Sequence, residues 1–125
     1  MWAGKKIAVL GLTFKPETDD MRDAPALAIL PALVEKGAIV RAHDPQGIEE
    51  AKPLLPDGVQ YDEDAYAAID GADAIVLMTE WNVYRGLDLA RVRDLMSGRV
   101  FVDLRNVYEP ADMQAAGFEY TGVGR

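Results

Sequence analysis

Short runs of consecutive hydrophobic residues alternate along this chain with segments in which hydrophobic residues recur at helical spacing. The clearest runs cover residues 6–10, 74–78 and 100–102, and a glycine, threonine or aspartate follows each of them at once. Continuous apolar runs of this length are typical of strands that are covered on both faces in a parallel sheet. The pattern predicts further strands at 38–43, 59–61 and 118–121.

The segments between the strands predict helices. Pro25 suits a first helical turn, Asp62 and Asp88 are predicted N-caps, and glycines follow several of the segments. Pro31 stands at a depth where a proline is expected to kink the helix or to leave one carbonyl unpaired. The expected helices cover residues 24–36, 46–54, 62–69, 88–96 and 109–116.

Regular alternation of strand and helix predicts an α/β fold in a single domain. We expect a three-layer, doubly wound, mainly parallel sheet of about six strands, in a Rossmann-like arrangement. Right-handed crossovers then place the carboxyl ends of the first, fourth and fifth strands on one rim. Open α/β sheets bind their ligands at that edge.

Composition limits the chemistry that this domain can perform. The 125 residues contain no cysteine, and this excludes a disulfide framework, a thiolate metal site and a cysteine nucleophile. They contain one histidine, His43. The net charge of −8 argues against a nucleic-acid or membrane surface. No apolar stretch is long enough to span a bilayer, and residues 1–4 do not resemble a signal peptide, so we expect a cytoplasmic protein.

The predicted rim collects charged and aromatic residues. Each has an ordinary explanation: a surface cation is usually solvated, Trp81 can cover the core, and Asp103 can brace a loop. Together they predict a site for an anionic small molecule. No base and nucleophile pair stands out, and Gly11 alone stands where a dinucleotide fingerprint needs three glycines. The rim residues are Lys15, Arg22, Thr79, Glu80, Trp81, Asp103, Arg105 and Asn106.

Four motifs, in order along the chain, resemble the UDP-glucose/GDP-mannose dehydrogenase family. Residues 11–26 (GLTFKPETDDMRDAPA) closely resemble the start of the family's C-terminal domain. Residues 43–45 (HDP), 79–81 (TEW, preceded by ADA at 72–74 and followed by Tyr84) and 103–106 (DLRN) resemble its later signatures. The resemblance covers Lys5 to Gly124, and the TEW form is most similar to UDP-glucose 6-dehydrogenases.

The resemblance implies an enzyme of three parts: an N-terminal NAD-binding Rossmann domain, a central helical dimerisation domain and this UDP-sugar-binding domain. Such enzymes oxidise the C6 alcohol of the sugar to a carboxylate in two NAD-dependent steps, through a cysteine that lies in the central part. This chain holds neither the cysteine nor the main NAD site. We therefore expect residues 5–125 to be one domain of a homo-oligomeric enzyme, and we expect this domain to be inactive by itself. Residues 1–4 are expected to be added or linking residues.

The resemblance also assigns roles to single residues. Phe14, Lys15 and Arg105 match positions that contact the UDP-sugar, and Arg22 matches an arginine that reaches NAD across the interdomain cleft. No catalytic residue and no metal ligand are expected. Asp19 and Asp20 are expected to brace the loop, and Trp81 to pack beneath the Thr79–Glu80 edge.

Several alternatives remain open at this stage. The chain could be a stand-alone nucleotide-sugar-binding or regulatory module, or the corresponding domain of a GDP-mannose or UDP-N-acetylmannosamine dehydrogenase. A more remote hypothesis is a hydrolase that uses Glu80 and Asp103 as a pair of carboxylates. We further expect the loop at residues 13–23 to be mobile when the partner domains are absent.

Overall fold

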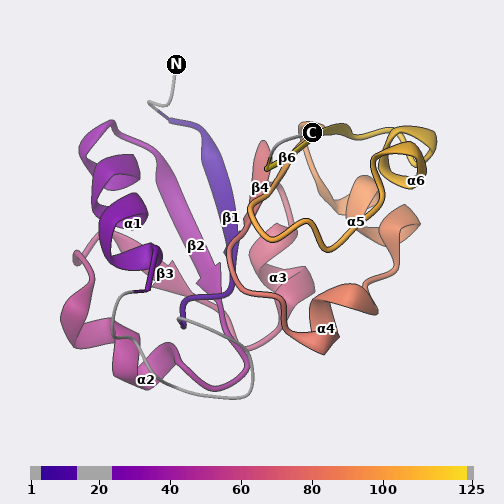
Figure 1. The fold of residues 1–125 in the computed structure, drawn as a ribbon. Coiled ribbons are helices and arrows are strands. Elements are labelled where there is room, and N and C mark those ends of the chain that lie inside the picture. The colour runs from indigo at the N-terminus through magenta and orange to yellow at the C-terminus, as the bar shows by residue number, and fades with distance from the viewer. Residues whose placement is uncertain (1–3, 14–23, 124–125) are drawn as a thin grey trace.

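The computed structural model describes residues 4–13 and 24–123 and contains one parallel sheet of six strands (Figure 1). The strand order is β3-β2-β1-β4-β5-β6, and each neighbouring pair is parallel. This confirms the predicted doubly wound sheet. The strands are β1 (Lys6–Leu10), β2 (Ile39–His43), β3 (Val59–Tyr61), β4 (Ala74–Leu77), β5 (Val100–Asp103) and β6 (Glu119–Gly122).

Helices cover the two faces of the sheet unequally. Helix α1 (Ala26–Glu35), helix α2 (Ile48–Ala51) and the 3-10 turn η1 (Lys52–Leu54) pack on the face of the β1–β3 half. The opposite face is covered by α3 (Ala65–Ile69), α4 (Asn82–Arg85), α5 (Leu89–Leu95) and α6 (Pro110–Ala115). Figure 1 shows the first group on the left of the sheet and the second on the right.

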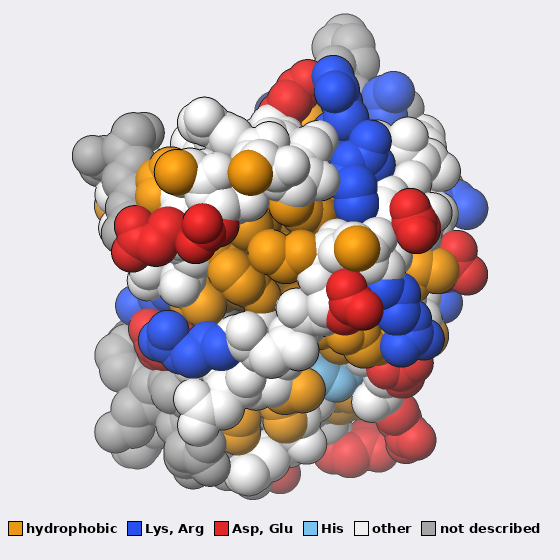
Figure 2. Space-filling model, turned by 90° about the vertical axis from the view of Figure 1, so that its right-hand side faces the viewer, with side chains coloured by type: hydrophobic (Ala, Val, Ile, Leu, Met, Phe, Trp, Pro, Cys, Tyr) orange, Lys and Arg blue, Asp and Glu red, His pale blue; other side chains and the backbone are white. Residues whose placement is uncertain are grey.

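The side chains of β1 explain why its sequence is apolar without interruption. Ile7 and Val9 belong to the hydrophobic cluster beneath α1, whereas Ala8 and Leu10 belong to the cluster beneath α3 and α5. Successive strand residues point to opposite faces, so a strand with two covered faces needs hydrophobic residues at every position. Figure 2 shows the side that carries α4, α5 and α6, where hydrophobic side chains are visible between acidic and basic ones.

The N-cap of α3 differs from the prediction. Asp64, not Asp62, is the N-cap of α3, and its carboxylate accepts from Tyr66 N. Asp62 instead pairs with the guanidinium of Arg41 on β2, with contacts of 2.9 and 3.0 Å. A two-pronged bond to arginine is a stronger use of a carboxylate than a helix cap, and it ties the turn after β3 to the neighbouring strand.

Other helix predictions are confirmed. Asp88 caps α5, and its carboxylate accepts from Ala90 N and Arg91 N. Helix α1 is present and continues past Pro31 to Glu35, while the expected kink or unpaired carbonyl at this proline stays a prediction. No helix within residues 4–13 and 24–123 is long and apolar enough to cross a membrane.

Candidate functional site

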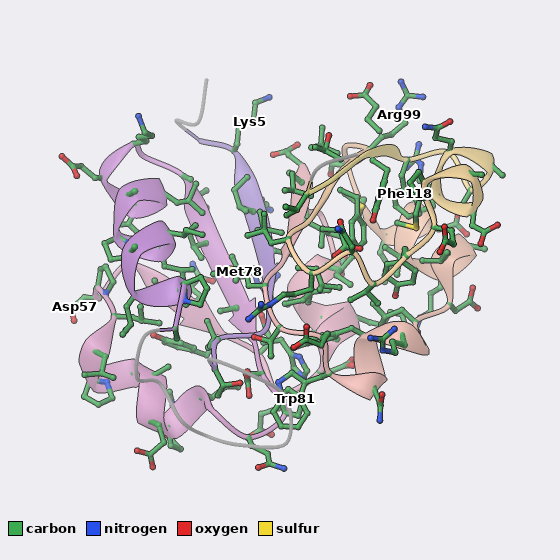
Figure 3. The ribbon with its side chains drawn as sticks, in the orientation of Figure 1. Lys5, Asp57, Met78, Trp81, Arg99 and Phe118 are labelled. Atoms are coloured by element: carbon green, nitrogen blue, oxygen red, sulfur yellow. The ribbon has the colours of Figure 1, made fainter. Side chains whose placement is uncertain are left out.

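The carboxyl ends of β1, β2, β4 and β5 lie next to one another and form the predicted rim. The sheet order reverses between β1 and β4, the topological switch point at which α/β proteins bind ligands. Figure 3 shows Trp81 at this end of the sheet, and Lys5 and Arg99 at the opposite end. The sequence therefore placed the ends of the first, fourth and fifth strands correctly.

Arg105 reaches from the end of β5 towards the end of β4. Its Nε donates to the carbonyl of Met78 at 3.2 Å and lies 3.8 Å from the Glu80 carboxylate. The Arg105 side chain is 32% exposed and that of Glu80 is 31% exposed. A partly exposed guanidinium held by a backbone carbonyl presents a fixed positive charge at the rim, and such a group suits phosphate oxygens.

Asp103 braces the loop that carries Arg105. Its buried carboxylate accepts from Arg105 N at 3.1 Å, Tyr108 N at 3.0 Å and the Tyr120 hydroxyl at 2.8 Å. The side chain is fully buried. This confirms the loop-bracing explanation and argues against the hydrolase hypothesis, because a carboxylate enclosed in this way cannot touch a substrate.

Asn106 and Trp81 are also used structurally. Asn106 adopts a positive φ of 52°, and its amide group exchanges two hydrogen bonds with the backbone of Val123 after β6. Asparagine tolerates this left-handed conformation better than most residues. Trp81 is 4% exposed and packs in the same hydrophobic cluster as Leu10 and Tyr84, which agrees with its predicted packing role.

A buried group at the end of β2 was not assigned a role from the sequence. The Tyr84 hydroxyl donates to the His43 carbonyl at 3.0 Å and lies 2.8 Å from His43 Nδ1. Burial lowers the pKa of His43 below its ordinary value, although Asp44 opposes this effect. Burial likewise raises the pKa of Tyr84 well above its ordinary value, so both groups are neutral near pH 7.

Asp44 occupies the backbone amides that begin the loop after β1. Its carboxylate accepts from Leu12 N at 2.8 Å and from Thr13 N at 3.1 Å. In a dinucleotide-binding turn these amides approach the pyrophosphate, and the acidic residue after the second strand binds a ribose. Here the acidic residue fills the turn, so these residues do not fit the pyrophosphate of NAD, as the lack of a glycine fingerprint predicted.

The remaining predicted site residues lie outside the described part of the chain. Phe14 and Lys15, predicted to contact the UDP-sugar, and Arg22, predicted to contact NAD, belong to residues 14–23, as do the two aspartates expected to brace the loop. Of the predicted binding residues, Arg105 is therefore the one that lies in the described part of the chain, at the rim.

Two hollows near the sheet are lined by residues that the structure describes, and neither of these has the character of an anion site at the rim. One of about 580 Å³ is lined by Lys5, Asp73 and Arg99 at the amino ends of the strands, with Ile7 and Val102 along the sheet. The smaller, of about 280 Å³, lies beside Asp44 and is lined also by Glu49 and Glu63. Ligands of α/β sheets bind at the other end from the first hollow, and the carboxylates of the second repel a phosphate.

The chain is similar to proteins of a known family. Residues 8–110 match the model of the UDP-glucose/GDP-mannose dehydrogenase family, UDP binding domain. A UDP-glucose 6-dehydrogenase from Rhizobium meliloti (strain 1021) is 49% identical over 122 residues, which are 98% of this chain and 28% of that protein.

Solved structures give the same result. A UDP-glucose dehydrogenase from Pyrobaculum islandicum superposes with a TM-score of 0.77 at 36% identity, over 97% of this chain and 26% of that one. An NDP-N-acetyl-D-galactosaminuronic acid dehydrogenase from Methanosarcina mazei Go1 superposes with a TM-score of 0.84 at 30% identity, over 98% and 25%. This chain thus spans about a quarter of the length of these relatives. The chain belongs to the UDP-glucose/GDP-mannose dehydrogenase family and is its UDP-binding domain.

Proposed function

We propose that this domain binds the UDP part of UDP-glucose at the carboxyl rim of its sheet and serves a UDP-glucose 6-dehydrogenase. The observation that carries the proposal is the match of residues 8–110 to a UDP-binding domain, together with 49% identity to a UDP-glucose 6-dehydrogenase. The switch point between β1 and β4, with Arg105 beside it, supports the rim as the place of binding. Phe14, Lys15 and Arg105 are the proposed contacts to the UDP-sugar, and Arg22 the proposed contact to NAD.

The proposed reaction is the oxidation of UDP-glucose to UDP-glucuronate in two NAD-dependent steps. This domain supplies substrate binding and no chemistry of its own, because it has no cysteine and its first turn does not fit NAD. We therefore expect no turnover of UDP-glucose by residues 1–125 alone. We infer that the nucleophile and the main NAD site lie in other parts of the enzyme, since this chain spans 28% of the length of the Rhizobium relative.

A titration of the ¹⁵N-labelled domain with UDP-glucose, UDP, GDP-mannose and NAD tests the proposal. UDP and UDP-glucose should shift the amides of Gly11–Thr13 and Arg105–Asn106, with a dissociation constant on the order of 0.1 to several mM because the other domains are missing. Preference for GDP-mannose would transfer the proposal to a GDP-mannose dehydrogenase. No shift with any of these compounds at several mM would contradict binding by this domain.

Arg105→Gln and Arg99→Gln form a matched pair of variants. Each removes one guanidinium, but Arg99 pairs with Glu119 at the opposite end of the sheet. Loss of a charge-assisted contact should weaken UDP binding about fivefold or more for Arg105→Gln and leave Arg99→Gln within about twofold of the wild type. Equal affinities of both variants would remove Arg105 from the proposed site.

A further inference from the structure

Asp44 has a larger set of partners than a residue that only ends a strand requires. Its side chain is 3% exposed, and one oxygen, Oδ2, accepts from Leu12 N, Thr13 N and Thr13 Oγ1 at 2.8, 3.1 and 3.2 Å. The other oxygen, Oδ1, accepts from Gln46 N at 2.9 Å and Gly47 N at 2.7 Å. The carboxylate therefore joins the loop after β1 to the turn that begins α2.

Thr13 is also held by Thr79, which follows the end of β4. The Thr79 hydroxyl donates to the Thr13 carbonyl at 2.7 Å, and Thr79 is fully buried. Thr13 itself is 1% exposed. The backbone N–H and the hydroxyl of Thr13 are thus tied to Asp44 at the end of β2, and its carbonyl is tied to Thr79 after β4, so two neighbouring strand ends hold this one residue.

We propose that Asp44 is a positioning residue for the UDP-sugar site, acting through Thr13. The proposal rests on the proposed function, because Thr13 directly precedes Phe14 and Lys15 in the chain. Asp44 and Thr79 together fix Thr13, the last described residue before these two proposed contacts in the sequence. Binding of the UDP-sugar then depends on a carboxylate that directly follows the neighbouring strand β2 and that does not itself contact the ligand.

A carboxylate is required because all five of these bonds come from donors. An asparagine at position 44 has one carbonyl oxygen, which can serve either the pair at Gln46 and Gly47 or the group at Leu12 and Thr13. The local turn is closer in sequence and keeps the oxygen, so the amide nitrogen faces the donors of Leu12 and Thr13. Asp44→Asn should therefore release the loop after β1 and leave the start of α2 intact.

Amide hydrogen exchange of the folded variant measures this directly and needs no ligand. In Asp44→Asn the exchange of Leu12 and Thr13 should accelerate about tenfold or more, while Gln46 and Gly47 stay protected. Asp88→Asn is the matched control, since Asp88 also accepts two backbone N–H groups but caps α5, where asparagine serves equally well. Unchanged exchange at Leu12 and Thr13 would overturn the proposal.

Titration with UDP-glucose then separates positioning from stability alone. Asp44→Asn should weaken binding about fivefold or more while circular dichroism reports a folded domain, and Asp88→Asn should bind as the wild type does. Affinity equal to the wild type in a variant with a released Thr13 would sink the inference. If the wild type does not bind UDP-glucose, the proposed function fails instead, and the exchange experiment still decides whether Asp44 anchors the loop.

Thr79→Val provides a second, independent variant should Asp44→Asn not fold. Valine keeps the shape of threonine but cannot donate to the Thr13 carbonyl. We expect weaker UDP-glucose binding and faster exchange near Thr13 with the carboxylate of Asp44 in place. A Thr79→Val domain that is wild-type in both respects would show that Thr13 needs no anchor for binding.

Discussion

At the scale of single residues, the His43–Tyr84 pair shows how a buried polar group is satisfied. The hydroxyl has one hydrogen, which it donates to the His43 carbonyl, so His43 Nδ1 must carry the hydrogen in the 2.8 Å contact between them. The imidazole is thereby fixed in one tautomer. The edge-on packing of the two rings, with centroids 5.6 Å apart, adds to the same contact.

Removing the Tyr84 hydroxyl leaves the Nδ1–H of His43 without its acceptor. The His43 carbonyl still accepts from Gly11 N at 2.8 Å, so the loss is mainly that of the imidazole. We expect Tyr84→Phe to lower the free energy of unfolding by about 1–3 kcal/mol, measured by urea denaturation. Tyr66→Phe, which loses an exposed bond from Asp88 N, is the control and should change it by about 0.5 kcal/mol or less. Equal stabilities would contradict the pairing.

His43 should also make the stability depend on pH. Burial lowers its pKa, so the unfolded chain binds more protons than the folded domain between the lowered value and the ordinary 6.5. Stability is therefore full above the unfolded pKa and falls as the pH drops through this range. The free energy of unfolding should decrease from about pH 7.5 to about pH 5.5, and His43→Gln should lose most of this dependence, because no other histidine is present. A domain more stable at the lower pH would refute this.

At the scale of elements, β1 and β4 approach closely at Gly11. A Cβ at this position would lie 2.5 Å from Thr79 Cβ and 2.6 Å from Thr79 N, and Gly11 has a φ of +98°. Glycine is therefore required both for the conformation and for the space, and this is why the first apolar run ends on it.

Gly11→Ala should consequently unfold or strongly destabilise the domain. We expect a loss of about 3 kcal/mol or more from strain and overlap, measured as a lower urea midpoint. Gly86→Ala is a matched control, since its added Cβ meets carbonyl oxygens at 3.8 and 3.9 Å, which is ordinary contact. It should stay within about 0.5 kcal/mol of the wild type. Tolerance of alanine at position 11 would mean that β1 and β4 can separate.

The strands were predictable because both of their faces are buried, so that consecutive residues in the sequence are hydrophobic. The runs at 74–78 and 100–102 correspond to β4 and β5, and Asp88 was recognised as a cap because its position before a helical pattern is a local signal. Helix α4 was missed, since Asn82–Arg85 is a single turn held by the packing of Tyr84. The cap at Asp64 was misplaced because Arg41, 21 residues away from Asp62, decides which aspartate is available.

The candidate site was predictable only in outline. Topology brings Arg105 and Thr79 to one rim, and the sequence pattern contains that topology. The role of Asp44 depends on Leu12 and Thr13, which lie more than 30 residues away in the sequence. The local sequence around Asp44 does not indicate these partners. The Asp44-Pro45 pair after a buried strand did signal a turn, which accounts for the bonds to Gln46 and Gly47 and for no others.

At the scale of the whole molecule, acidic residues dominate the charge. The chain has 21 acidic and 13 basic side chains, a net charge of −8, and few of the described ion pairs are buried. Self-repulsion of this size opposes the compact state and is screened by salt. Raising NaCl from about 20 mM to about 200 mM should therefore raise the urea midpoint. A midpoint that falls would show that the surface ion pairs outweigh the net charge.

The central place of β1 in the sheet has a kinetic consequence. β1 is the first strand in the chain, yet it pairs with β4 through a register that joins Ile7 to Ala74 and with β2 on its other side. A chain emerging from the ribosome must keep an apolar central strand with one unpaired edge until β4 has been made. Because β1 and β4 are far apart in the sequence, their pairing should make refolding take milliseconds to seconds. Until they pair, the exposed apolar strand makes the incomplete chain a substrate for chaperones.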